Sequence, residues 1–125
     1  MDTHILISLF HLLFVVPFFL YVGLQRSATQ EIIYTVLLTL GVIITLYHGY
    51  KSWVRYTAGS PYLYVNLIHA VLLGPLLIYM GVKGRDTPRA AYEMLLMFAF
   101  AAGGYHLYSL VQQMNNVRTD EQKSH

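Results

Sequence analysis

Four long apolar runs, separated by short polar segments, dominate the hydrophobic pattern of this chain. The runs are Ile5–Leu24, Ile32–Trp53, Tyr62–Val82 and Ala90–Val111. Each holds roughly 20 residues, and a helix of that length, rising about 1.5 Å per residue, spans the roughly 30 Å hydrocarbon layer of a membrane. The pattern therefore predicts an all-α protein, a four-helix bundle integral to a membrane.

The composition agrees with this interpretation. Of the 125 residues, 56% are hydrophobic and only 11% are charged, whereas soluble domains carry about 25% charged residues. There is too little polar surface to cover a water-soluble globule, so we expect the lipid bilayer as the principal partner. The formal net charge of +2 is too small and too dispersed to indicate nucleic acid.

An even number of spans places the N- and C-termini on the same side of the membrane. Which side this is should follow from lysine and arginine in the loops. One side would carry Lys51, Arg55, Arg118 and Lys123, and the other Arg26, Lys83, Arg85 and Arg89. Because the two counts are equal, the sequence does not choose an orientation.

The residues that punctuate the apolar runs recur 58 positions later. His11, Pro17, Tyr21 and Gly23 return as His69, Pro75, Tyr79 and Gly81, and Tyr47, His48 and Tyr50 return as Tyr105, His106 and Tyr108. This predicts two tandem helical hairpins, residues 1–58 and 59–116, within a single transmembrane domain that covers residues 1–125. A direct repeat keeps its orientation, so the hairpins should be parallel, with a pseudo-two-fold axis along the membrane normal. The polar tail, residues 117–125, is expected to fray.

Local signals refine these helices. Pro17 cannot donate to the preceding turn, so we expect a bend there. Thr29 is a candidate N-cap for the second helix, and Glu31 suits its first turn. Gly41 and Thr45 form a small-xxx-small pair that lets another helix approach closely.

One histidine occupies each apolar run. Counting from the helix ends places His11, His48, His69 and His106 at a similar depth. An ionisable side chain inside a membrane is costly, and this makes it a candidate functional residue. His48 and His106 share a face with the small residues of their helices and should point inward. For His11 and His69 the uniformly apolar runs give no direction.

Neutral imidazole is a common ligand for zinc, copper, iron and haem. The chain contains no cysteine, so thiolate ligands are excluded. We therefore expect a transition metal or haem at the histidine layer, serving redox chemistry or ligand binding. All four histidines are candidate metal ligands, and His48 and His106 are the candidate haem ligands.

Other residues could complete such a site. Lys51 and Arg55 continue the face of His48 towards water and could meet haem propionates. Tyr47, Tyr105 and Asn66 are candidate partners that fix the imidazole tautomers. These five residues, with His48 and His106, form the predicted cofactor site.

Other functions remain open from the sequence. Because histidine titrates near neutrality, the same layer could gate a proton- or ion-conducting homo-oligomer. The histidines could also simply hydrogen-bond neighbouring helices in a structural scaffold or assembly subunit. Enzymatic activity has little support, since we find no carboxylate pair, no activated nucleophile and no loop long enough to build a substrate pocket.

Overall fold

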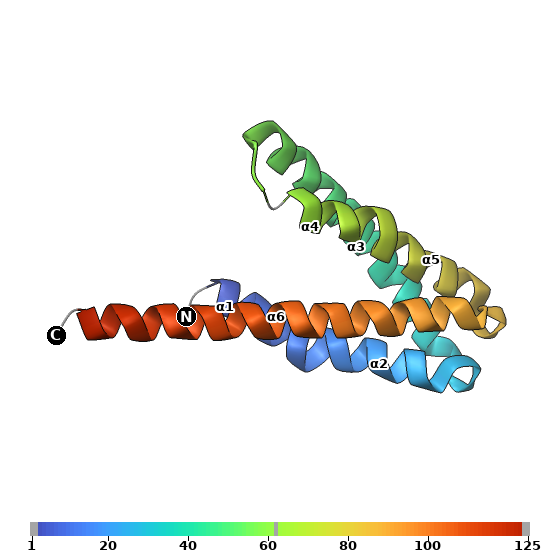
Figure 1. Ribbon diagram of the computed structural model, residues 1–125. Coiled ribbons are helices and arrows are strands. Elements are labelled where there is room, and N and C mark those ends of the chain that lie inside the picture. Colours follow the sequence, from blue (N-terminus) through green and yellow to red (C-terminus); the bar gives the residue numbers. More distant parts are fainter. Residues whose placement is uncertain (1–2, 62, 124–125) are drawn as a thin grey trace. The chain divides into compact units, whose positions relative to one another are not determined.

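The computed structural model describes residues 3–61 and 63–123, and every regular element within these ranges is a helix. Met1, Asp2, Ser124 and His125 lie outside the described residues, as does Tyr62, the expected first residue of the third helix. The α-helices are α1 (Thr3–Phe10), α2 (Val16–Gln25), α3 (Glu31–Ala58), α4 (Leu63–Ile68), α5 (Gly74–Lys83) and α6 (Arg89–Lys123) (Figure 1). The all-α prediction is confirmed.

These elements join into four continuous helical spans. The spans Ile5–Ala28, Glu31–Ala58, Leu63–Asp86 and Arg89–Arg118 are each long and apolar enough to cross a membrane. Each contains one of the four predicted apolar runs, apart from the undescribed Tyr62. The predicted number and placement of the helices are therefore confirmed.

Helix α6 is longer than the sequence pattern predicts. It covers 35 residues and continues to Lys123, through most of the polar segment that was expected to fray. That segment is rich in Gln, Arg, Glu and Lys and contains neither Gly nor Pro. Straight-chain residues of this kind lose little side-chain freedom in a helix, so nothing in the local sequence ends α6 earlier.

The irregular segments of the first and third spans occupy matching positions. A π-helical segment covers His11–Val15 in the first span and His69–Leu73 in the third. A 3₁₀ turn follows at Arg26–Ala28 and again at Gly84–Asp86. A widened π-turn therefore precedes Pro17, where a bend was expected, and the same turn precedes Pro75.

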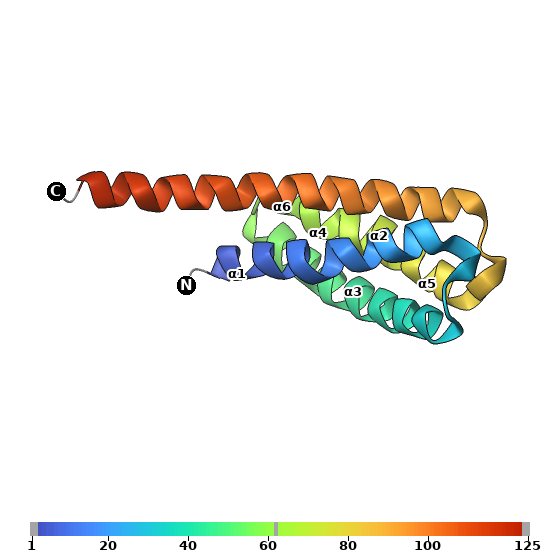
Figure 2. The same ribbon diagram turned by 90° about the horizontal axis from the view of Figure 1, so that it is seen from below.

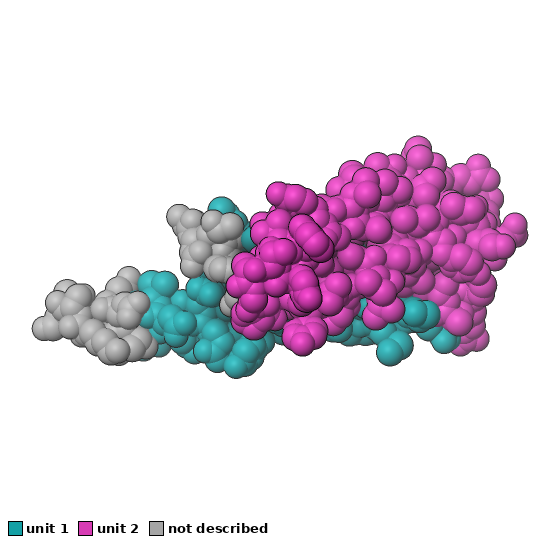
Figure 3. Space-filling model, turned by 90° about the horizontal axis from the view of Figure 1, so that it is seen from above, with its two compact units in different colours: residues 1–24, 93–125 teal, residues 25–92 magenta. Residues whose placement is uncertain are grey.

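The chain divides into two compact units (Figure 3). The outer unit contains residues 1–24 and 93–125, and the inner unit contains residues 25–92. Each unit therefore combines one helix from each predicted hairpin.

In the inner unit, α3 runs antiparallel to α4 and α5 and packs along them (Figures 1 and 2). Glycines allow the close approach. A Cβ atom on Gly41 would lie 2.8 Å from the backbone nitrogen of Ile78, and one on Gly81 would lie 2.7 Å from that of Leu38. Thr45 meets Gly74 in the same interface. The small pair Gly41 and Thr45 thus admits a neighbouring helix, as its spacing predicts.

Hydrogen bonds close the loop end of the inner unit. The hydroxyl of Tyr34 donates to the carbonyl oxygen of Arg26 at 3.0 Å and lies 2.7 Å from the hydroxyl of Tyr92. The Thr87 hydroxyl donates to Gly84 at 2.6 Å. Thr29 does not cap α3 as predicted, because the N-cap is Gln30, without a side-chain hydrogen bond. Glu31 does occupy the first turn.

In the outer unit, α1 and α2 lie beside α6 and run in the opposite direction (Figures 1 and 2). A Cβ atom added to Gly103 would lie 3.7 Å from a methyl carbon of Val16, an ordinary packing distance. One turn beyond Gly103, the ring of His106 meets the ring of His11. The two spans therefore meet at the level of the histidines.

Candidate functional site

Four histidines, one from each helical span, form two stacked pairs, one in each unit. In the outer unit the rings of His11 and His106 have centroids 4.2 Å apart and planes inclined by 19°. In the inner unit the rings of His48 and His69 have centroids 4.6 Å apart and planes inclined by 28°. Within each pair the histidines therefore stand at the same height, and His11 and His69 each point towards the facing helix.

The two pairs are built in the same way. One ring comes from the first residue of a π-segment, His11 or His69. The other ring, His48 or His106, comes from the interior of a long regular helix, α3 or α6. Each histidine of one pair lies 58 positions from its counterpart in the other, since His11 matches His69 and His48 matches His106.

Backbone carbonyls fix the proton on His11 and His69. The Nδ1 atom of His11 lies 2.7 Å from the carbonyl oxygen of Ile7, and that of His69 lies 2.7 Å from the carbonyl oxygen of Val65. A carbonyl oxygen can only accept a hydrogen bond, so Nδ1 must carry the hydrogen in both rings. In the neutral imidazole the lone pair then lies on Nε2.

Asn66 has the same effect on His48. Its side-chain oxygen Oδ1 lies 2.8 Å from Nδ1 of His48, so Nδ1 donates and Nε2 of His48 keeps its lone pair. Asn66 is only 4% exposed. It is the one predicted tautomer-fixing residue that makes a hydrogen bond of this kind to an imidazole in the described part of the chain.

His106 is the most buried of the four histidines, at 9% exposure. The position equivalent to Asn66 in its unit is occupied by Ser8, which is 2% exposed. A buried polar residue therefore stands at the matching place in both units.

The predicted tyrosines contact the histidines edge-on. Tyr47 meets His48 with ring centroids 5.1 Å apart and planes at 83°, and Tyr105 meets His106 at 5.2 Å and 82°. Both tyrosines are exposed. They pack against the rings that follow them in sequence, and their role in fixing tautomers stays a prediction.

Lys51 and Arg55 were the remaining predicted members of the cofactor site, and their role there stays a prediction. Lys51 and Arg55 are half-buried on the turns that follow His48. His48 and His106, the predicted haem ligands, belong to different units, and each stacks on a histidine of its own unit. Among the described residues, no group of three or more His, Asp or Glu side chains is close enough to hold a metal ion.

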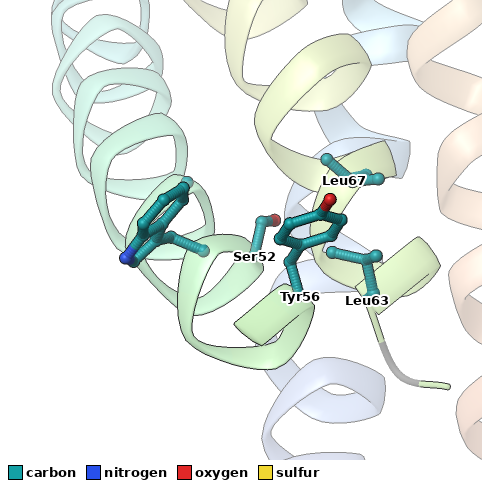
Figure 4. Close-up of a pocket in the computed structure, with 6 residues that line it drawn as sticks. Ser52, Tyr56, Leu63 and Leu67 are labelled. Carbon is teal, nitrogen blue, oxygen red and sulfur yellow. The ribbon is translucent and has the colours of Figure 1, made fainter. Parts of the chain in front are cut away.

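A shallow groove of about 310 Å³ opens beside this region of the inner unit, between α3 and α4 (Figure 4). It is lined by Gly49, Ser52, Trp53, Tyr56, Leu63 and Leu67. The hydroxyl of Ser52 donates to the carbonyl oxygen of His48 at 2.7 Å, so it is already engaged. Apart from the hydroxyl of Tyr56 and the indole N–H of Trp53, the rest of the lining is apolar.

Sequence reasoning missed the groups that act through the backbone. The carbonyls of Ile7 and Val65 cannot be identified from side-chain types, although each lies four residues before a histidine. Ser52 also lies four residues after His48, a spacing typical of serine bonding back to a helix carbonyl. These i, i+4 relationships are the signal that could have found them.

No protein-family model matches the sequence, and no curated protein or solved structure matches it significantly.

Proposed function

We propose that this chain is a four-pass integral membrane protein built from two tandem hairpin repeats, and that its paired histidines bind a first-row transition-metal ion. The observation that carries the metal proposal is the position of the imidazole hydrogen on Nδ1. Three of the four imidazoles hold their hydrogen on Nδ1 against a carbonyl oxygen, so that in the neutral ring the lone pair lies on Nε2.

The surface supports a membrane location. Large apolar side chains cover the helices, with Leu46 at 70%, Val82 at 71% and Leu24 at 69% exposure. Soluble monomers rarely expose contiguous apolar patches of more than a few hundred Å². Four helices of transmembrane length with such surfaces are suited to lipid.

Matched geometry supports the tandem repeat. The π-segments, the 3₁₀ turns and the stacked pairs all recur at the same offset. Tyr34 and Tyr92, which are 58 residues apart, contact each other directly. Equivalent residues touch where they approach an axis that relates two repeats, so this contact supports the proposed pseudo-two-fold axis.

The tautomers support metal binding. Metal-ligating histidines usually donate their second ring N–H to a carbonyl or carboxylate, which orients the ring and raises its basicity. His11, His48 and His69 each have such a partner. With no cysteine in the chain, the donors are imidazole nitrogens, which suit Zn, Cu and Fe. Two protein ligands per pair would leave coordination positions open for an external ligand.

The ring spacing limits the size of the ligand that a pair can hold. Rings whose centroids lie 4.2 Å or 4.6 Å apart leave no room for a haem within a pair. The proposal is therefore restricted to a small ion.

Elemental analysis of the purified protein tests the proposal. After loading with excess Zn²⁺ or Cu²⁺ and gel filtration, we expect two ions per chain, one at each pair. His48→Gln/His69→Gln and His11→Gln/His106→Gln should each lower the metal content. His125→Gln, outside the described residues, is the matched control. No retained metal in the wild type would overturn the proposal, and a Soret band lost in His48→Gln would restore the haem alternative.

Proton transfer is the second candidate, because an Nε2 lone pair that binds a metal also accepts a proton. Proton flux into liposomes that is lost in His48→Gln and His106→Gln would favour it, and unchanged flux would remove it. If these variants only lower stability, with neither flux nor metal content altered, the histidines tie the helices together in a structural protein.

A further inference from the structure

Both π-segments end immediately before a proline. The last π-type hydrogen bond of the first segment joins the Val16 amide to the carbonyl oxygen of His11, and Pro17 follows. In the second segment the Gly74 amide donates to the carbonyl oxygen of His69, and Pro75 follows. π-turns inside helices are rare and concentrate at functional sites, so their recurrence at the same distance from a histidine calls for a physical cause.

The prolines supply that cause. In a regular helix the residue at position 17 would donate its amide hydrogen to the carbonyl of Leu13, but proline has no amide hydrogen and its ring crowds that carbonyl. Widening the turn removes the crowding, at the expense of one regular hydrogen bond. The same holds for Pro75 and the carbonyl of Val71.

The widened turn also sets the direction of the histidine. A single π-turn takes up one extra residue while the helix on either side keeps its direction. If the same sequence closed into a regular helix, each residue before the turn would rotate by about 100° relative to those after it. His11 and His69 are the first residues of their π-segments. They would therefore move off the faces on which His106 and His48 meet them.

We propose that Pro17 and Pro75 are positioning residues, which keep the π-turns open and thereby hold His11 against His106 and His69 against His48. The metal-binding part of this inference rests on the proposed function. The ring-pairing part does not, because it can be measured in the metal-free protein.

The test replaces each proline and then compensates for the lost turn. Pro17→Ala restores an amide hydrogen and should close the π-turn, rotating His11 away from His106. Deleting Phe14, an exposed residue within the π-segment, in the Pro17→Ala background gives a regular helix with the original facing. The double variant should therefore regain the pair although it lacks both the proline and a residue. Pro75→Ala and deletion of Leu72 are the corresponding changes in the inner unit.

Two readouts are needed. The first is the ring-current shift of the histidine ring protons by NMR in histidine-labelled protein in micelles, which reports stacking without metal. The second is Zn²⁺ affinity, which should fall about 10–100-fold at the affected pair, as when an orienting partner of a ligand is lost, and should recover in the double variant. Pro88→Ala is the control, since Pro88 lies in the turn before α6 and adjoins neither π-segment.

The outcomes separate the two proposals. Loss of the ring-current shift in the proline variants, with recovery in at least one deletion variant, supports the positioning role even in a protein that binds no metal. Unchanged shifts in both Pro17→Ala and Pro75→Ala overturn it. Failure of both deletion variants to restore stacking while circular dichroism shows intact helices also overturns it.

Discussion

The Tyr34 hydroxyl stands between two partners, donating to the carbonyl oxygen of Arg26 and lying 2.7 Å from the Tyr92 hydroxyl. Because a carbonyl oxygen only accepts, the proton of Tyr34 is committed to Arg26, and Tyr92 must be the donor to Tyr34. Within this series of hydrogen bonds Tyr34 donates to a backbone carbonyl and Tyr92 donates to Tyr34. The two tyrosines therefore have different partners, although they occupy equivalent positions in the two predicted hairpins.

Tyr34→Phe and Tyr92→Phe should each destabilise the protein by about 1–3 kcal/mol. Tyr34→Phe removes the bonds to Arg26 and Tyr92, and Tyr92→Phe removes the bond to Tyr34 together with the one that Tyr92 forms with Thr87. Unfolding in mixed micelles with increasing SDS, followed by circular dichroism, measures both. The double variant should cost less than the sum of the single changes, because the two side chains share a hydrogen bond. Additive losses would contradict the contact between the two hydroxyls.

Alanine at Gly41 or Gly81 should push α3 and α5 apart. The added methyl group would meet the backbone of the facing helix at 2.8 Å or 2.7 Å, and overpacking of this kind costs about 1–3 kcal/mol. Gly104→Ala is the control, since nothing lies within 4 Å of its added Cβ. That change should be neutral or stabilise α6 by about 0.5–1 kcal/mol. A Gly41→Ala or Gly81→Ala variant as stable as Gly104→Ala would contradict the described packing.

Arg26→Gly should stabilise the protein. Arg26 has a φ of 53°, a conformation that costs residues with a side chain, and its counterpart in the second hairpin is Gly84, with a φ of 57°. Glycine relieves the backbone strain but has more conformational freedom in the unfolded chain. The net effect should raise the free energy of unfolding by about 1 kcal/mol. Gly84→Ala should shift the same SDS unfolding midpoint in the opposite direction. A destabilised Arg26→Gly variant would show that the arginine side chain contributes more than the strain costs.

Asn66→Leu should weaken metal binding by about 10–100-fold, because the partner that holds the proton on Nδ1 of His48 is removed. Asn66→Asp keeps an acceptor oxygen at the same place and should retain most of the affinity. Competition with a zinc chelator measures both variants. Equal losses would indicate that Asn66 supports packing and does not orient the imidazole.

Much of the fold was accessible from sequence because its signals are local. Runs of apolar residues predict the spans, and the small pair Gly41 and Thr45 predicts a close helix contact. Asn66 could be selected as a partner for an imidazole because a buried amide in an apolar run needs a hydrogen bond. These inferences depend on residue type and spacing alone.

The pairing of the histidines was less accessible. The first and third spans are apolar on all sides, so periodicity gives no direction for His11 or His69. Each π-turn changes the direction in which the side chains before it point relative to those after it. Counting residues assumes a regular helix and therefore misses this change. The length of α6 was underestimated for a different reason. The polarity of the tail, residues 117–125, was interpreted as a sign of fraying, although its described part includes helix formers such as Glu121 and Lys123.

The hydrogen-bond acceptors that hold the proton on Nδ1 are backbone carbonyls for His11 and His69 and a side chain for His48. They therefore respond differently to mutation. Any residue type at position 7 or 65 that keeps the helix, which excludes proline, presents the same backbone carbonyl. Substitutions at these two positions therefore leave the tautomers of His11 and His69 unchanged. Asn66, in contrast, anchors His48 with a side chain and can be lost in a single codon change. Among variants of this protein that retain the histidines, substitution should therefore be tolerated at Ile7 and Val65 and restricted at Asn66.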